Sequence, residues 1–229
     1  MSKDFLGHRL LFVTAHPDDE TYLASGTITA NTEKGGESFL ICATLGEKGK
    51  SHVGKSITAS QLKAVRKKEL TAVAKLLQVK KLSLLDLKDG NLCNCENILF
   101  KKLKSLIQKF KPEVLISFGS DGITGHLDHI AVGQAVSIIA HQLNLPFVVF
   151  SAPPAFIKQC EKMKDRRKHG VYKNELTYQK HNFKIKISSK LKLQALMLHA
   201  SQISNQDPFL NFPAGVKKQM LNYEYFFTK

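Results

Sequence analysis

Runs of apolar residues alternate with longer amphipathic stretches along most of the chain. Short apolar runs that end in polar residues predict strands, and stretches with apolar positions three or four apart predict helices. On this basis we expect strands at residues 9–15, 38–45, 81–87, 113–118 and 146–151. We expect helices between them, at residues 20–34, 60–77, 98–110 and 128–143.

This alternation favours an α/β fold with a doubly wound, mostly parallel sheet and helices on both faces, because connections between parallel strands cross over in one hand. After residue 151 the pattern loosens, and we expect a short strand at 184–187 and helices at 189–201 and 216–226. The chain of 229 residues is expected to form a single domain over 1–229, with its core at 9–151 and a basic segment and C-terminal helices at 152–229.

The charge is strongly basic, with 34 Lys and Arg against 19 Asp and Glu and a net charge of +15. Residues 158–192 hold twelve of the basic residues and three of the acidic ones. Such an excess suggests an acidic partner, and a basic nucleic-acid-binding protein is one alternative. No recognised nucleic-acid module accompanies the excess, so we expect no specific nucleic acid and instead a basic lip that favours an anionic substrate. The residues expected to form the lip are Lys164, Arg166, Arg167 and Lys168.

Several protein classes are disfavoured by composition. No run reaches the roughly 18 apolar residues of a membrane-spanning helix, so we expect no membrane span and a cytoplasmic protein. Four cysteines in a chain of this length do not make a disulfide framework. The sequence leaves open whether the chain forms a homo-oligomer.

Two polar clusters follow the first and fourth expected strands. The first contains His16, Asp18 and Asp19, and the second, within residues 119–129, ends in His126-Leu127-Asp128-His129. In open α/β sheets, ligands bind at the carboxyl ends of the strands. The carboxylates alone could be helix caps. Caps would not need three histidines, which favours a joint site.

Two histidines and one carboxylate around a divalent ion form an arrangement typical of catalytic zinc sites. His16 and Asp19 are three residues apart at a turn, so they can converge on one ion and leave Asp18 free as a general base. Such an ion lowers the pKa of water and polarises a carbonyl. One histidine of the second cluster completes the ligand set, and the spare one stabilises an oxyanion or protonates a leaving group, with Asp128 tuning it.

The residues that carry a family resemblance are His16-Pro17-Asp18-Asp19-Glu20 and Gly125-His126-Leu127-Asp128-His129. Together they resemble the LmbE/PIG-L family of metal-dependent N-acetylglucosamine deacetylases. The pattern departs from that of many members at Leu127, where they have proline. Supporting matches extend the resemblance over residues 9–202; they are Thr44-Leu45-Gly46-Glu47-Lys48-Gly49, Arg66 with Glu69, Asp89-Gly90 and His199-Ala200-Ser201-Gln202.

The resemblance implies a Rossmann-like fold and the removal of an N-acetyl group from an N-acetylglucosamine-containing conjugate, giving acetate and a free amine. It implies zinc, with Fe²⁺ or another divalent metal as alternatives, bound by His16, Asp19 and His129. It further implies Asp18 as the general base and His126 as the group that assists the tetrahedral intermediate. On the same basis we expect three substrate contacts: Arg66, Asp89 and His199.

A competing motif lies in residues 49–56, which match the P-loop pattern G-x-x-x-x-G-K-[ST]. It leaves a P-loop-like nucleotide hydrolase as an alternative. In a P-loop the first glycine directly follows its strand, so that backbone N–H groups wrap the phosphates. Here three residues separate Leu45 from Gly49, and we expect a basic loop beside the site instead.

Overall fold

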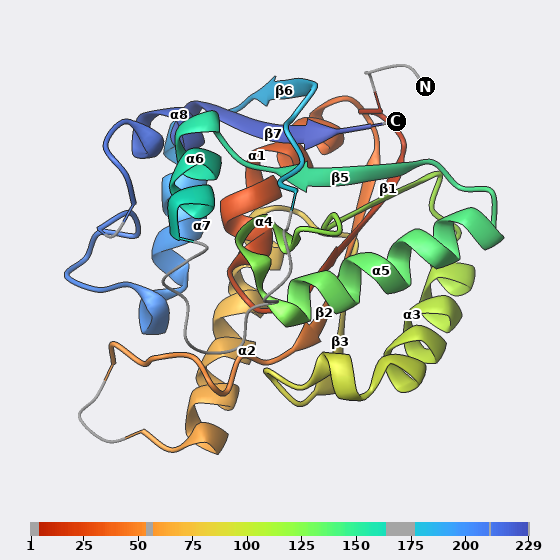
Figure 1. The fold of residues 1–229 in the computed structure, drawn as a ribbon, viewed down its shortest axis with the longest axis horizontal. Coiled ribbons are helices and arrows are strands. Elements are labelled where there is room, and N and C mark those ends of the chain that lie inside the picture. Colours follow the sequence, from red (N-terminus) through yellow and green to blue (C-terminus); the bar gives the residue numbers. More distant parts are fainter. Residues whose placement is uncertain (1–4, 54–56, 164–176, 211, 229) are drawn as a thin grey trace.

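The computed structural model describes residues 5–53, 57–163, 177–210 and 212–228, and it is built on one seven-stranded sheet (Figure 1). The strands lie in the order β3-β2-β1-β4-β5-β7-β6. Their bounds are β1 Arg9–Thr14, β2 Glu37–Thr44, β3 Lys81–Leu87, β4 Val114–Ser117, β5 Phe147–Ser151, β6 Phe183–Lys186 and β7 Tyr223–Phe227. The α-helices are α1 Asp19–Glu33, α2 Ala59–Leu76, α3 Glu96–Phe110, α4 Gly122–Gly125, α5 Leu127–Gln142, α6 Pro154–Met163, α7 Ser189–Leu198 and α8 Val216–Asn222. Short 3₁₀ turns lie at η1 Leu92–Asn94 and η3 Ala200–Gln202.

Strands β1 to β5 pair in parallel, while β7 runs antiparallel to both β5 and β6. The expected doubly wound, mostly parallel α/β fold is confirmed. The strand order reverses direction between β1 and β4, which are adjacent in space but separated by β2 and β3 in sequence. This switch point is where open α/β sheets bind ligands.

Helices cover both faces of the sheet (Figure 1). On one side α7 packs against α1 and α2, and on the other α3 packs against α5. The central strand β1 is buried between them, with Leu10 to Val13 fully inaccessible to solvent. A strand buried on both faces has a continuous apolar run as its sequence pattern, which is why β1 was predictable.

The expected helix at 216–226 is wrong in its second half. Helix α8 ends at Asn222, and β7 begins at Tyr223. The sequence from Tyr223 to Phe227 is rich in aromatic residues, which favour strands, and Phe226 is buried against Phe150 of β5 and Phe183 of β6. Pairing with two strands distant in sequence therefore decides the conformation of these residues. Helix α6 was also not expected.

None of the helices within the described ranges combines the length and the hydropathy required to traverse a bilayer.

Candidate active site

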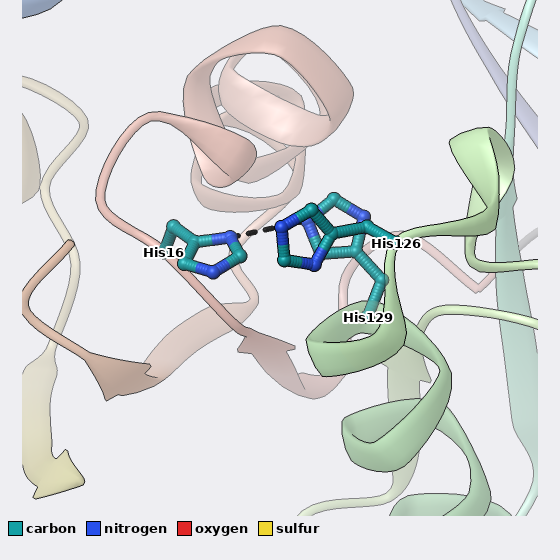
Figure 2. A group of neighbouring side chains, drawn as sticks. All are labelled: His16, His126 and His129. Atoms are coloured by element: carbon teal, nitrogen blue, oxygen red, sulfur yellow. Dashed lines mark hydrogen bonds between the residues drawn. The ribbon is translucent and has the colours of Figure 1, made fainter. Parts of the chain in front are cut away.

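The two polar clusters meet at the switch point because β1 and β4 are neighbours in the sheet. His16 and Asp19 lie at the end of β1 and the start of α1, and His129 lies in the first turn of α5 (Figure 2). His16 Nδ1 is 3.2 Å from His129 Nε2, and His129 Nε2 is 3.2 Å from Asp19 Oδ1. His16 Nδ1 is 3.7 Å from Asp19 Oδ2. Three side chains of the kinds that ligate metals thus face one another.

Hydrogen bonds on the outer side of each ring determine which nitrogen is free. His16 Nε2 lies 3.1 Å from Asp89 Oδ1 and 3.3 Å from Asp128 Oδ2. His129 Nδ1 lies 3.0 Å from the carbonyl oxygen of Gly122, and its ring stacks on Phe118. Because all these partners accept hydrogen bonds, the outer nitrogens carry protons, and the inner nitrogens face the centre, where each can offer a lone pair to a metal or hold a further proton.

The charge around His16 also favours a cation. Burial lowers the pKa of His16, but hydrogen bonds to Asp128 and Asp89 and the charge of Asp19 outweigh it and raise the pKa to about 10. Burial raises the pKa of Asp19, and the facing His129 and His16 lower it well below its usual range. The cluster therefore attracts positive charge to its centre, in the form of an extra proton or of a metal ion.

The donor set fits a divalent ion with nitrogen and oxygen ligands. Tetrahedral zinc with bonds of about 2.0–2.1 Å holds its ligand atoms roughly 3.3–3.4 Å apart, close to the separations of 3.2, 3.2 and 3.7 Å between His16, Asp19 and His129. Ligand atoms of two further sets lie within 4.8 Å of one another: His16, His126 and His129, and His16, Asp89 and Asp128. The second of these sets meets His16 through its outer nitrogen and supports the ring.

Asp18 lies beside this cluster in a strained conformation, with φ 106° and ψ −27°. Its carbonyl oxygen accepts the first hydrogen bonds of α1, from Thr21 and Tyr22, while its carboxylate Oδ2 accepts a 3.0 Å bond from Arg66 Nη2. Burial raises the pKa of Asp18, and the charge of Arg66 offsets part of this rise, so that the pKa is about 6. A positive φ in a residue other than glycine marks a position where the surroundings impose the conformation, often at functional sites.

His126 precedes α5 at the end of a second strained segment, in which Ile123 has φ 64°. His126 Nδ1 accepts a 3.2 Å hydrogen bond from the backbone N–H of Asp128, so the proton of the neutral ring is on Nε2. Burial and the nearby His129 and His16 lower the pKa of His126 to about 4. A neutral histidine that can donate from Nε2 at pH 7 is suited to an oxyanion.

Asp128 faces His16, whereas we expected it to act on His126. Its Oδ1 accepts a 3.0 Å bond from Leu92 N, and its Oδ2 accepts a 2.6 Å bond from Gly90 N and faces His16. The carboxylate thus supports His16, and it reaches His126 only through its charge and through the backbone N–H that caps that ring. We assign Asp128 to positioning.

A pocket of about 280 Å³ opens at these groups. Its lining residues are His16, Asp18, Lys48, Gly49, Arg66, Asp89, Gly90, His126 and Gln202. Lys48 and Gln202 were not singled out from the sequence, although each falls within a stretch that matched the family pattern. Their position in those stretches was the available signal.

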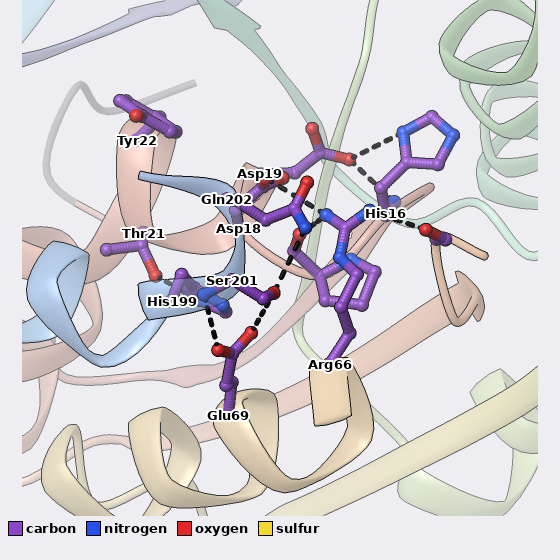
Figure 3. A network of polar contacts seen from close by, with 12 residues as sticks. His16, Asp18, Asp19, Thr21, Tyr22, Arg66, Glu69, His199, Ser201 and Gln202 are labelled. Atoms are coloured by element: carbon purple, nitrogen blue, oxygen red, sulfur yellow. Dashed lines mark hydrogen bonds and ion pairs between the residues drawn. The ribbon is translucent and has the colours of Figure 1, made fainter. Parts of the chain in front are cut away.

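Arg66 is buried, although the neighbouring residues Lys67 and Lys68 on α2 are exposed. Its guanidinium donates to the carbonyl oxygens of Gly46 and Pro17 and to Asp18 (Figure 3). Gly46 has φ +68°, and a Cβ there would collide with Arg66 Nη1, so glycine is required where the guanidinium crosses the loop. Arg66 joins the two loops and lines the pocket.

The other two expected substrate contacts are largely engaged by protein groups. Asp89 lines the pocket, but its Oδ1 faces His16 and its Oδ2 accepts a 2.9 Å bond from Lys48 N. His199 is 1% exposed, with Nε2 2.8 Å from Glu20 Oε1 and 3.1 Å from Thr21 Oγ1. Figure 3 shows His199 and Thr21 side by side. It supports the first turn of α1, and it is not among the residues that line the pocket.

The helix that follows the P-loop pattern does not begin where a P-loop requires it to begin. Helix α2 begins at Ala59, after a capping box in which Thr58 and Gln61 satisfy each other's backbone N–H groups. Residues 54–56, which hold the lysine and serine of the pattern, lie outside the described residues. Since a P-loop lysine opens its helix, the late start of α2 disfavours a phosphate cradle.

Comparison with known proteins agrees with this geometry. The family model for PIG-L, described as GlcNAc-PI de-N-acetylase, matches residues 11–140. The probable N-acetyl-alpha-D-glucosaminyl L-malate deacetylase 2 of Bacillus anthracis is 34% identical over 130 residues, covering 56% of this chain and 57% of that protein. A 1D-myo-inositol 2-acetamido-2-deoxy-alpha-D-glucopyranoside deacetylase of Corynebacterium glutamicum is 29% identical over 170 residues, covering 65% and 58% respectively. The match thus spans somewhat more than half the length of these relatives.

Solved structures show the same fold over nearly the whole chain. N,N'-diacetylchitobiose deacetylase from Pyrococcus horikoshii superimposes with a TM-score of 0.69 at 26% identity, covering 96% of this chain and 82% of that one. The 4-carboxy-2-hydroxymuconate hydratase of Pseudomonas putida has a TM-score of 0.61 at 21% identity, covering 85% and 80%. The second likeness concerns the fold alone.

Proposed function

The chain belongs to the PIG-L family, and from that premise we propose that it hydrolyses the N-acetyl group of an N-acetylglucosamine-containing conjugate, giving acetate and a free amine. The observation that carries this proposal is the triangle of His16, Asp19 and His129 with Asp18 beside it and His126 against it. The fold does not select the reaction, since a hydratase shares it. The side chains at the switch point, and not the fold, therefore indicate the reaction.

We infer that a divalent ion, zinc in the first place, is held by His16 Nδ1, the Asp19 carboxylate and His129 Nε2. When bound, such an ion polarises the amide carbonyl and lowers the pKa of water. Asp89 and Asp128 fix the His16 ring, and the Gly122 carbonyl and Phe118 fix the His129 ring. Supporting partners of this kind orient metal-binding histidines and hold the proton on the outer nitrogen.

In the proposed reaction Asp18 takes a proton from the attacking water and then passes it to the nitrogen of the leaving amine. Its pKa of about 6 suits both transfers near neutral pH. Arg66 fixes the Asp18 carboxylate with a 3.0 Å hydrogen bond. His126, neutral and with its proton on Nε2, donates to the oxyanion that forms at the amide carbonyl.

The proposal is tested by measuring acetate release from a panel of N-acetylglucosamine glycosides with purified protein. We expect turnover that a chelator abolishes and that added zinc or another divalent metal restores. A matched panel of N-acetylgalactosamine glycosides tests the choice of sugar. Absence of acetate release from every glycoside, with the metal present, would contradict the proposed function.

A further inference from the structure

We propose that Lys48 is a specificity-determining residue that binds a carboxylate on the non-sugar part of the substrate. The inference rests on the proposed function and extends it to a class of conjugate. Lys48 lines the pocket, and its ammonium group makes no hydrogen bond or ion pair within the part of the chain that the structure describes. The other charged groups of the lining are paired, Asp18 with Arg66 and Asp89 with His16. Among the described residues of this lining, Lys48 thus has the charged group that is available to bind a ligand.

The backbone of Lys48 is fixed relative to the reacting groups. Its N–H donates a 2.9 Å hydrogen bond to Asp89 Oδ2, and the other oxygen of the same carboxylate lies 3.1 Å from His16 Nε2. Asp89 N donates in turn to Glu47 Oε1 at 2.9 Å, and Gly49 N closes a turn onto Gly46 O at 3.0 Å. A single carboxylate thus connects the Lys48 loop to the expected metal ligand His16.

The side chain of Lys48 lies along the pocket wall because Gly90 leaves room for it. A Cβ at Gly90 would lie 2.8 Å from Lys48 Nζ and 3.1 Å from Lys48 Cδ. Gly90 also has φ +66°, and its N–H donates a 2.6 Å bond to Asp128 Oδ2, so its position is fixed as well. The lysine stem therefore lies against the Gly90 backbone beside the catalytic groups, although Lys48 as a whole is an exposed residue.

This location differs from the basic lip expected from the sequence. The residues of that lip, Lys164, Arg166, Arg167 and Lys168, lie outside the described residues. Lys192, the last residue of the basic segment, is fully buried and paired with Glu224. Within the described part of the pocket, the attraction for an anion comes instead from Lys48, which precedes the basic segment by more than a hundred residues.

The experiment uses two glycosides of N-acetylglucosamine that differ only in charge, the carboxymethyl glycoside and its primary amide. For each we measure KM from acetate release, and Kd by calorimetry with Asp18→Asn also present in each protein so that the glycoside is not consumed. The quantity of interest is the ratio of the amide value to the carboxylate value. In the unaltered protein we expect this ratio to exceed one, and Lys48→Met, which keeps the apolar stem, should lower it by about 3–10-fold.

Two further variants sharpen the test. Lys48→Glu should lower the ratio more than Lys48→Met, and Lys48→Arg should largely preserve it, because charge is the property that matters. Lys50→Met is the matched control, since Lys50 is exposed in the same loop, as Lys48 is, but does not line the pocket. Equal changes for both glycosides, or no change in the ratio, would overturn the role of Lys48.

The calorimetric measurement separates the two proposals. If neither glycoside is hydrolysed but the Kd ratio responds to Lys48 as stated, the proposed function fails and the carboxylate site stands. If both are hydrolysed and neither ratio responds, the proposed function stands and the role of Lys48 is wrong. Added salt should reduce the Kd ratio in the unaltered protein and should have less effect in Lys48→Met.

Discussion

Helix α1 meets two buried groups of charges, one at its first turn and one at its middle, and they are satisfied to different degrees. At the middle, Glu224 accepts hydrogen bonds from Gly26 N at 2.9 Å and from Thr27 N at 2.7 Å, and it pairs with Lys192 at 2.9 Å. Lys192 also donates a 2.6 Å bond to the carbonyl oxygen of Tyr22. Both charged side chains are completely buried.

At the first turn the polar groups are less completely paired. Arg66 Nε, His199 Nδ1 and Glu47 Oε2 are buried without a hydrogen-bond partner among the described residues. Asp18 has a strained backbone, and its pKa is raised to about 6. Buried polar groups usually find partners. The comparison indicates that the charges at the middle of α1 are fully paired, whereas its first turn combines a strained residue with unpaired buried polar atoms, a combination found more often at functional sites.

The largest effect is expected from Asp18→Asn, which should lower turnover without lowering stability. Removal of the general base should lower kcat for acetate release by about 10²–10⁴-fold. Asparagine tolerates a positive φ and its amide oxygen can still accept from Arg66, and because burial already disfavours the Asp18 charge, the free energy of unfolding should stay the same or rise slightly. Steady-state kinetics and urea denaturation of the metal-loaded protein measure the two quantities. Full turnover in this variant would remove Asp18 from the base role.

Lys192→Met should show the opposite behaviour. It leaves the Glu224 carboxylate buried without its counter-ion, and breaking a buried pair in this way costs about 3–5 kcal/mol of stability. We expect a large fall in the free energy of unfolding and a much smaller change in kcat for the protein that remains folded. The double variant Lys192→Met, Glu224→Gln removes both charges and should recover part of the loss. A stability unchanged by Lys192→Met would contradict the structural role of the pair.

These two regions also differ in how far the sequence revealed them. The strands β1 and β4 are buried apolar runs, and the histidines and carboxylates at their ends predicted a joint site, while the ligand set was implied by the family resemblance. Lys192 was counted with a basic segment, and its burial was not expected, because its partner Glu224 lies 32 residues away on a strand for which the sequence predicted a helix. Pairings between distant residues, and not local pattern, determine its burial.

Within the site, too, contacts between distant residues were not visible in the local sequence pattern. The residues of the clusters could be selected from their place at strand ends and from the family resemblance, but the direction of each side chain could not be predicted. Asp128 faces His16 instead of His126, and His199 faces Glu20. Arg66 is buried because the loop glycine Gly46 leaves room for its guanidinium, and this contact between a loop and a helix is not visible in the local sequence pattern.

Arg66→Lys is expected to lower both kcat and the free energy of unfolding. Each effect should be smaller than the effect of Asp18→Asn on kcat or of Lys192→Met on stability. Lysine keeps the charge but loses the planar fork that contacts Pro17, Gly46 and Asp18 at once. We expect a loss of about 1–3 kcal/mol in stability, because buried carbonyl oxygens lose their donors, and a fall in kcat of about tenfold. Lys67→Arg on the exposed side of the same helix is the control. An effect on stability with kcat unchanged would show that Arg66 has no part in holding Asp18.

The smallest effect is expected from Ser25→Ala. Its hydroxyl donates a 2.9 Å bond to the carbonyl oxygen of Thr21, one helical turn earlier, and lies 3.4 Å from Glu224 Oε1, a long contact to a carboxylate that already accepts shorter bonds. We expect the free energy of unfolding to change by no more than about 0.5 kcal/mol and the kinetics to stay the same. A loss of several kcal/mol would mean that the pair in the middle of α1 is less well satisfied than its contacts indicate.

The central claim is that His16, Asp19 and His129 hold a divalent ion, and the metal content of purified variants tests it most directly. We expect about one bound ion per chain in the unaltered protein. His129→Ala should lose it, while His126→Ala, within the pocket, and His141→Ala, on the exposed side of α5, should retain it. Elemental analysis after dialysis gives the result without reference to activity. Full metal content in His129→Ala, or equal loss in His126→Ala, would contradict the ligand set.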